Sequence, residues 1–194
     1  NGPFVGQHPL SAAEIQLIRR WVDEGAAEGD PRSAPPARHW TEGWQLGQPD
    51  LVVTFTQPYT LPPEGTDAFR IFVLPIPTNA VRYVRALEFR PGNPKVVHHA
   101  NIRIDKTPAS RQLDEAQSGP GYDGLIAHSA QYPDGHFLGW TPGQVAPLLP
   151  KDLAWRLETQ SDLVFELHMR QSGKAESLAP TLGLYFKDTS PSRT

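Results

Sequence analysis

The sequence predicts a mainly β protein, an antiparallel β-sandwich or jelly roll with one short N-terminal helix. Proline and glycine, 21 and 16 of 194 residues, make up about a fifth of the chain, whereas average usage is roughly 12%. Seven short apolar segments alternate with stretches rich in these turn-forming residues, a pattern typical of an all-β fold and not of a helical bundle. The length suits one domain with a small appendage, because domains usually have roughly 100–200 residues.

The N-terminal segment predicts a helix that begins at Ser11 and ends before Gly25. Ser11 and Glu14 have the spacing of a capping box, and glycine is common just beyond a helix C-terminus. Apolar residues recur at helical spacing and form one stripe: Ile15, Leu17, Ile18, Trp21 and Val22. The proline- and charge-rich stretch that follows is expected to be a linker. We therefore divide the chain into a helical appendage with its linker, 1–38, and a β-sandwich domain, 39–194.

Strands are expected where apolar or alternating residues run between turns. These segments are 51–56, 69–74, 83–89, 96–104, 153–157, 163–169 and 181–186. The interval 105–137 has little periodicity, and an ordered loop of that length is uncommon unless it has a function. We expect this loop and the N-terminal helix to be the surfaces that contact protein partners.

Composition excludes several classes of function. Without cysteine the chain cannot form a disulfide framework, a zinc–cysteine site, an iron–sulfur cluster or a c-type haem attachment. The 18 basic and 21 acidic residues give a net charge of −3, which argues against nucleic acid as a partner. No segment has the roughly 18–20 apolar residues of a membrane span. The chain starts at Asn1 and lacks a recognisable leader, so we expect it to be processed or to be part of a longer chain.

Common catalytic motifs are missing as well. The sequence has no Gly-x-Ser-x-Gly elbow and no phosphate-binding loop, and no catalytic residue is assigned. Acidic residues without paired spacing are expected to be mostly solvated: Glu64, Asp67, Asp114, Glu115 and Asp123.

The dipeptide His98-His99 is the most informative feature, because imidazole suits copper, zinc, iron and nickel. Successive side chains of a regular strand point to opposite faces. The period-2 pattern thus places His98 with Val96 and Ala100, and His99 on the other face. A shared metal site would require a bulge or a distorted strand end, with a third ligand from a neighbouring strand. His168 could supply that ligand, because alternation in 163–170 places it opposite the face of Met169. The alternative is one buried histidine and one exposed histidine with no metal.

Four further histidines are weaker candidates. His128 and His136 lie in or near the long loop and could add a fourth ligand. His8 and His39 belong to the N-terminal region and are expected to be structural or solvated. Met169 is the single methionine and is expected in the core, although a thioether can also bind copper.

The chain resembles a known family in three ordered segments. VVHHANIRID, then HFLGWTPGQVAPLLPKDLAWRLETQSDLVFELHM, then LGLYFKD look like the amino-terminal domain of copper type II, ascorbate-dependent monooxygenases. That family includes peptidylglycine α-hydroxylating and dopamine β-monooxygenases and bacterial relatives. The resemblance extends over residues 44–187. It implies a jelly-roll sandwich, one copper ion held by His98, His99 and His168, and a periplasmic or extracytoplasmic location.

The sequence also departs from that family. Its catalytic copper is held in a second domain by a His-x-His motif and a methionine, and no His-x-His occurs here. The usual cysteines of the first domain are absent too. The segment PLSAAEIQLIRRWVDEGAAEGD resembles the last helix of bacterial cytochrome c domains that precede such domains, but no haem is expected.

Three functions follow from these expectations. The first is a non-catalytic, copper-binding, monooxygenase-like domain that transfers electrons or is a vestige of such an enzyme. The second is an accessory subunit without bound metal, docked onto a larger membrane-associated redox complex. The third is one half of an ascorbate-dependent copper hydroxylase whose second domain is not in this chain.

Overall fold

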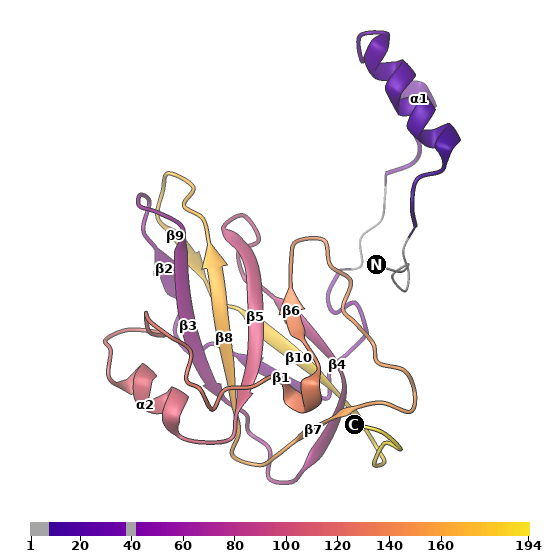
Figure 1. Cartoon of the computed structure of the whole chain (residues 1–194). Coiled ribbons are helices and arrows are strands. Elements are labelled where there is room, and N and C mark those ends of the chain that lie inside the picture. Colours follow the sequence, from indigo (N-terminus) through magenta and orange to yellow (C-terminus); the bar gives the residue numbers. More distant parts are fainter. Residues whose placement is uncertain (1–7, 38–41) are drawn as a thin grey trace. The chain divides into compact units, whose positions relative to one another are not determined.

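The computed structural model describes residues 8–37 and 42–194 of the chain (Figure 1). The chain divides into two compact units, Asn1–Trp40 and Thr41–Thr194. The boundary expected between residues 38 and 39 lies outside the described residues. We describe each unit by itself.

The N-terminal unit contains the predicted helix, α1 (Ala12–Asp23). The capping box is formed as predicted: the backbone N–H of Glu14 donates to Ser11 Oγ, and the backbone N–H of Ser11 donates to the Glu14 carboxylate. The helix ends before Gly25, whose φ of +91° is the left-handed conformation that glycine adopts easily. A short 3₁₀ helix, η1 (Pro31–Ser33), interrupts the expected linker. None of the residues of α1 is buried.

The second unit is mainly β, with antiparallel pairing between its strands, as predicted. One four-stranded sheet has the order β1-β10-β4-β7 and the other the order β3-β8-β5-β6, and β2 pairs with β9. The strands are β1 (Leu51–Thr54), β2 (Tyr59–Leu61), β3 (Ala68–Pro75), β4 (Arg82–Arg90), β5 (Val97–Asp105), β6 (Leu138–Trp140), β7 (Trp155–Leu157), β8 (Asp162–Met169), β9 (Glu176–Leu178) and β10 (Thr181–Lys187).

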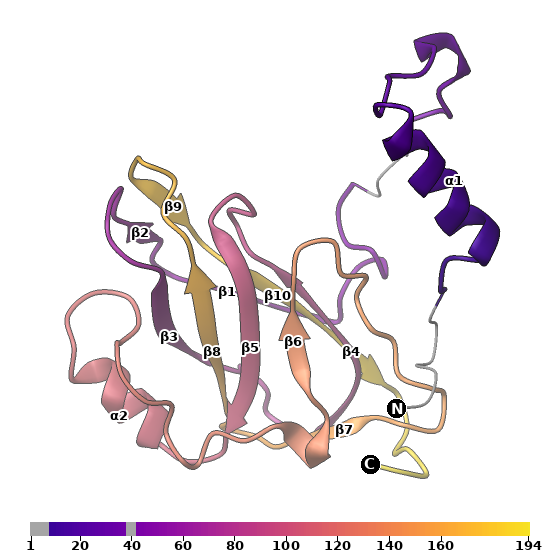
Figure 2. The same cartoon turned by 45° about the horizontal axis from the view of Figure 1, so that its top comes forward.

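A single apolar core lies between the two four-stranded sheets and makes the unit a sandwich. Figures 1 and 2 show β3, β8, β5 and β6 as one layer, with β1, β10 and β4 in the other. Phe165 of β8 is fully buried and its ring lies 6.1 Å from that of Phe89 of β4. Period-2 alternation explains this packing, because Phe165, Leu167 and Met169 point inward together. The jelly-roll winding of the strands stays a prediction.

Three short strands, one helix and the 3₁₀ turns were not predicted from the sequence. The strands β2, β6 and β9 have three residues each, which is too short to show an alternating pattern. The helix α2 (Ala109–Glu115) lies in the interval expected to be a loop and buries only Ser110. It therefore has no apolar stripe that a helical period could reveal. A 3₁₀ turn, η2 (Pro133–Gly135), follows later in the same interval.

The long interval covers one end of the outer face of the β3-β8-β5-β6 sheet. Tyr122 pairs with Ile71 of β3, and Gln131 pairs with Ile104 of β5. A second, smaller apolar cluster forms beneath it from Ile71, Tyr122, Ala130 and Val164. Both cartoon views place α2 next to β3 at this end (Figures 1 and 2). The other end of the same face is where β5 begins and β8 ends, and there the histidines lie.

Candidate metal centre

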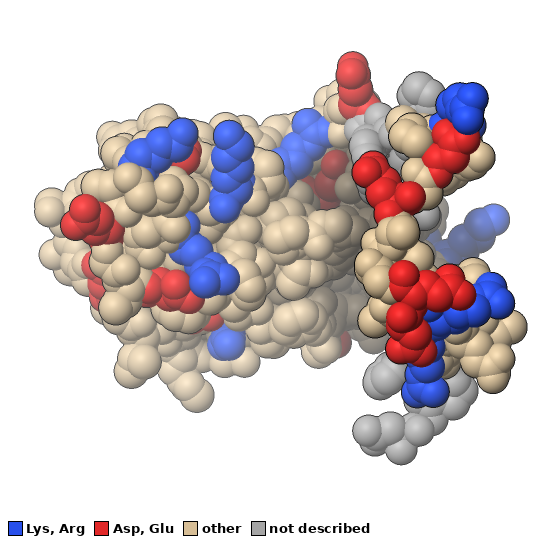
Figure 3. Space-filling model, turned by 90° about the horizontal axis from the view of Figure 1, so that it is seen from above, with Lys and Arg blue, Asp and Glu red and all other residues tan. Residues whose placement is uncertain are grey.

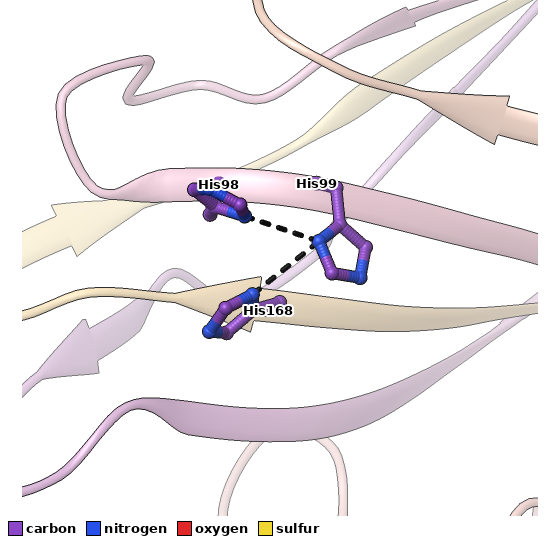
Figure 4. Close-up of side chains that lie close together, drawn as sticks. All are labelled: His98, His99 and His168. Carbon is purple, nitrogen blue, oxygen red and sulfur yellow. Dashed lines mark hydrogen bonds between the residues drawn. The ribbon is translucent and has the colours of Figure 1, made fainter.

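Three histidines from two neighbouring strands come together at the start of β5 and the end of β8. His98 and His99 are the second and third residues of β5, and His168 is the penultimate residue of β8. The antiparallel register places His99 directly opposite His168. Figure 4 shows the three rings directed toward one another from these strands.

A β-bulge explains how two consecutive histidines reach the same side. The β5–β8 register shifts between Val97 and His99, so His98 is the extra residue. A bulge places two residues of one strand opposite one of its partner and breaks the alternation. The regular pattern is therefore wrong for His98 and Val97: Val97 is buried in the core and His98 is exposed beside His99. The distorted strand that a shared site requires is thus present.

Two of the three pairs of nitrogen atoms are spaced nearly as ligands of one ion would be. His99 Nδ1 lies 3.2 Å from His98 Nδ1 and 3.3 Å from His168 Nδ1, and the donor atoms of all three lie within 4.8 Å of one another. Imidazole nitrogens about 2.0–2.1 Å from a common metal would be separated by about 3.3–3.6 Å in a tetrahedral or trigonal site. The three side chains could therefore hold a metal ion.

Hydrogen bonding among the rings does not account for this cluster. His168 Nε2 lies 2.8 Å from Asp67 Oδ2, and a carboxylate only accepts, so the Nε2 proton is assigned to this contact. In a neutral ring, His168 Nδ1 then carries a lone pair and can only accept a hydrogen bond. If His99 Nδ1 carries a proton, it can donate along one of its two short contacts but not along both. A cation at the centre would satisfy all three nitrogens at once.

Burial and the neighbouring charges favour the neutral form of His99. Burial lowers the pKa of His99, the neighbouring His168 and His98 lower it further, and the nearby Glu166 opposes them. A metal binds the neutral imidazole. The lowered pKa therefore favours the ligand form of His99 at neutral pH.

Two residues from the start of β3 hold His168 in place, and sequence reasoning missed both. Asp67, expected to be solvated, accepts the hydrogen bond from His168 Nε2. The ring of Phe69 stacks on that of His168, with centroids 4.2 Å apart and planes 5° apart. Phe69 is the register partner of His168 across β3 and β8. No sequence signal identifies either residue, because the pairing of β3 with β8 joins segments about a hundred positions apart.

The remaining candidates do not join this group. Among the described residues, the group of side chains that could hold a metal ion consists of His98, His99 and His168. His128 and His136 therefore do not supply a fourth ligand here. The loop that carries them is paired to β5 near Ile104, about 17 Å along the strand from the bulge. Met169 is fully buried in the core, as predicted. His8 is exposed, and His39 lies outside the described residues.

The surface charge is mixed, in agreement with the small net charge. On the face of the β unit seen in Figure 3, basic and acidic side chains are interspersed instead of gathered into a patch of one sign. Within the described residues, no helix combines the length and the apolarity that a membrane crossing needs.

Comparison with known proteins gives no assignment. No protein-family model matches the chain, and no curated protein matches it significantly. The resemblance to copper monooxygenases therefore stays a prediction, and the geometry of the three histidines is the observation on which a function can be built.

Proposed function

We propose that this chain is an extracytoplasmic, copper-monooxygenase-like domain that binds one copper ion through His98, His99 and His168. By itself the domain would transfer electrons and would not hydroxylate a substrate. The observation that carries the proposal is the approach of three Nδ1 atoms on two paired strands. The resemblance of the three sequence segments to copper monooxygenases supports the choice of metal and the location.

The donor set supports copper among the metals that imidazole binds. Three neutral nitrogens with no thiolate suit copper or zinc, and a given site of this kind usually binds Cu²⁺ more tightly than Zn²⁺. Three imidazoles can also serve Cu(I) and Cu(II) with modest rearrangement, which an electron-transfer site needs. The ligands come from rigid paired strands, so the site would hold its geometry through a redox cycle.

Metal titration of the purified chain tests this proposal. We expect one equivalent of copper per chain, retained in competition with an equal amount of zinc, and a loss of tight binding in His98→Ala, His99→Ala and His168→Ala. His128→Ala is a matched control, because His128 is an exposed histidine outside the cluster. Far-ultraviolet circular dichroism would establish that each variant keeps its β structure.

Two outcomes would contradict the proposal. Wild-type protein that stays free of metal in excess copper would remove its basis. Equal loss of copper in His128→Ala and His168→Ala would show that binding is a general property of surface histidines.

A second candidate, an accessory subunit of a larger redox complex, is favoured by the N-terminal helix. Within the described residues of its unit this apolar stripe is not buried: Ile18, Trp21 and Val22 are each about half exposed. An uncovered amphipathic helix commonly marks a protein-binding surface. In this case Ile18→Glu with Trp21→Glu would abolish stable co-purification with the partner subunits, whereas Gln16→Glu on the opposite side of the helix would not. A complex that survives the double substitution would count against this candidate.

A further inference from the structure

We propose that Asp67 and Phe69 are positioning residues that fix the ring plane and the tautomer of His168, so that its Nδ1 lone pair faces the other two histidines. This inference rests on the proposed metal site and adds a second layer of residues to it. The two residues flank the first position of β3, on the side of β8 away from β5.

The carboxylate of Asp67 determines which nitrogen of His168 carries the proton. Asp67 Oδ2 lies 2.8 Å from His168 Nε2, and the Nε2–H donates to it. A neutral imidazole has one proton, so this hydrogen bond leaves Nδ1 free to bind a metal. Arg170 Nε lies 3.7 Å from the other oxygen of Asp67. The carboxylate is thus held between two groups, which restricts its rotation.

The ring of Phe69 determines the plane of His168. The two rings are stacked nearly parallel, because Phe69, His168 and His99 are register partners across β3, β8 and β5. His168 thus lies in the middle of a cross-strand row with an apolar ring on one side and a ligand on the other. Phe69 is 54% exposed although it is a large apolar side chain. The stacking on His168 gives a reason for an exposed phenylalanine at this position.

Outer partners of this kind normally strengthen a metal site. A carboxylate on the far nitrogen of a ligating histidine orients the ring and raises its basicity, and its removal typically weakens metal binding about 10–100-fold. Here the carboxylate comes from the β2–β3 connection, which supplies no ligand itself. The connection would act on the site through His168 alone.

Two measurements on Asp67→Ala, Asp67→Asn and the wild type test the inference. Copper affinity, measured against a competing chelator, should fall about 10–100-fold in Asp67→Ala, with the stoichiometry unchanged at saturation. Asp67→Asn should lose less copper affinity than Asp67→Ala, because an amide oxygen still accepts the hydrogen bond from His168 Nε2. Glu64→Ala is the matched control, since Glu64 is an exposed carboxylate of the same connection and should leave the affinity within about twofold. Phe69→Leu should weaken binding, whereas Phe137→Leu, at another exposed phenylalanine, should not.

The second measurement needs no metal. Nitrogen-15 NMR of the metal-free protein at pH 8 should show His168 with its proton on Nε2, and a mixture of tautomers in Asp67→Ala. Wild-type protein with the proton on Nδ1 would overturn the inference whatever the copper result. Unchanged copper affinity in Asp67→Ala, with binding lost in His168→Ala, would overturn it while the proposed site stands. Failure of the wild type to bind copper would overturn the proposed site. The tautomer of His168 in the metal-free protein would still show whether Asp67 positions that ring.

Discussion

The site depends on single residues whose roles follow from their immediate surroundings. His98 belongs to it because it is the extra residue of a bulge, and His99 because it occupies the outer face of β5. His168 is 9% exposed and lies between Phe69 and His99. Each imidazole therefore reaches the cluster for a different local reason. Substitution of each histidine should accordingly have its own measurable effect.

The pH dependence of folding should report His99. Its pKa is lowered in the folded protein, chiefly by burial, whereas the unfolded chain takes up a proton near pH 6.5. Between the two values the unfolded state binds more protons, so the free energy of unfolding of the metal-free protein should decrease as the pH falls through about 6.5. Urea unfolding of the wild type and His99→Gln at pH 8 and pH 5.5 measures this.

The variant comparison makes the pH prediction specific. His99→Gln should lose part of the pH dependence between these two values, whereas His128→Gln should retain it all. Identical pH dependence in the wild type and His99→Gln would contradict the role assigned to His99.

At the scale of elements, the outer face of the β3-β8-β5-β6 sheet is shared between a covering segment and the histidine cluster. The covering segment is anchored by Asp105, the last residue of β5, which is fully buried. Its carboxylate accepts hydrogen bonds from Thr107, Ser110 and Ser129. Burial by itself would raise the pKa of Asp105, but these hydrogen bonds outweigh it and lower the pKa.

Substitution of Asp105 should cost stability without affecting the metal site. Asp105→Ala would leave buried hydroxyl and backbone donors unpaired and should lower the free energy of unfolding by about 2–4 kcal/mol. Copper stoichiometry should not change, because Asp105 lies about 20 Å along β5 from His99. Exposed Asp188 is a matched control, and Asp188→Ala should change stability by less than about 0.5 kcal/mol. A loss of copper binding in folded Asp105→Ala would show that the two ends of the sheet are coupled.

Elements differ in how far the sequence predicts them. Alternation in 163–169 predicts β8 and the outward direction of His168, because a core-facing strand repeats every two residues. From the sequence, a bulge at His98 could be stated only as a requirement for a shared metal site, since the bulge depends on the β5–β8 register. The hydrogen bond from His168 to Asp67 could not be foreseen, because it depends on which strand becomes the neighbour of β8. Local pattern thus predicts strands, whereas contacts between distant segments arise from the sheet order.

For the whole molecule, the sandwich uses one sheet for two purposes. The inner face of the β3-β8-β5-β6 sheet packs into the core through residues such as Phe165 and Leu167, while its outer face carries the histidines at one end. A rigid, well-packed layer beneath the ligands is what a preorganised metal site requires. The N-terminal unit adds the amphipathic helix α1.

A crystal structure of the protein loaded with copper tests the central claim most directly, with the ion located by anomalous scattering at the copper edge. The account predicts one copper ion per chain, about 2.0–2.1 Å from the Nδ1 atoms of His98, His99 and His168, with the Asp67–His168 hydrogen bond retained. Copper bound elsewhere, or a cluster that stays empty at saturating copper with its rings turned apart, would contradict it.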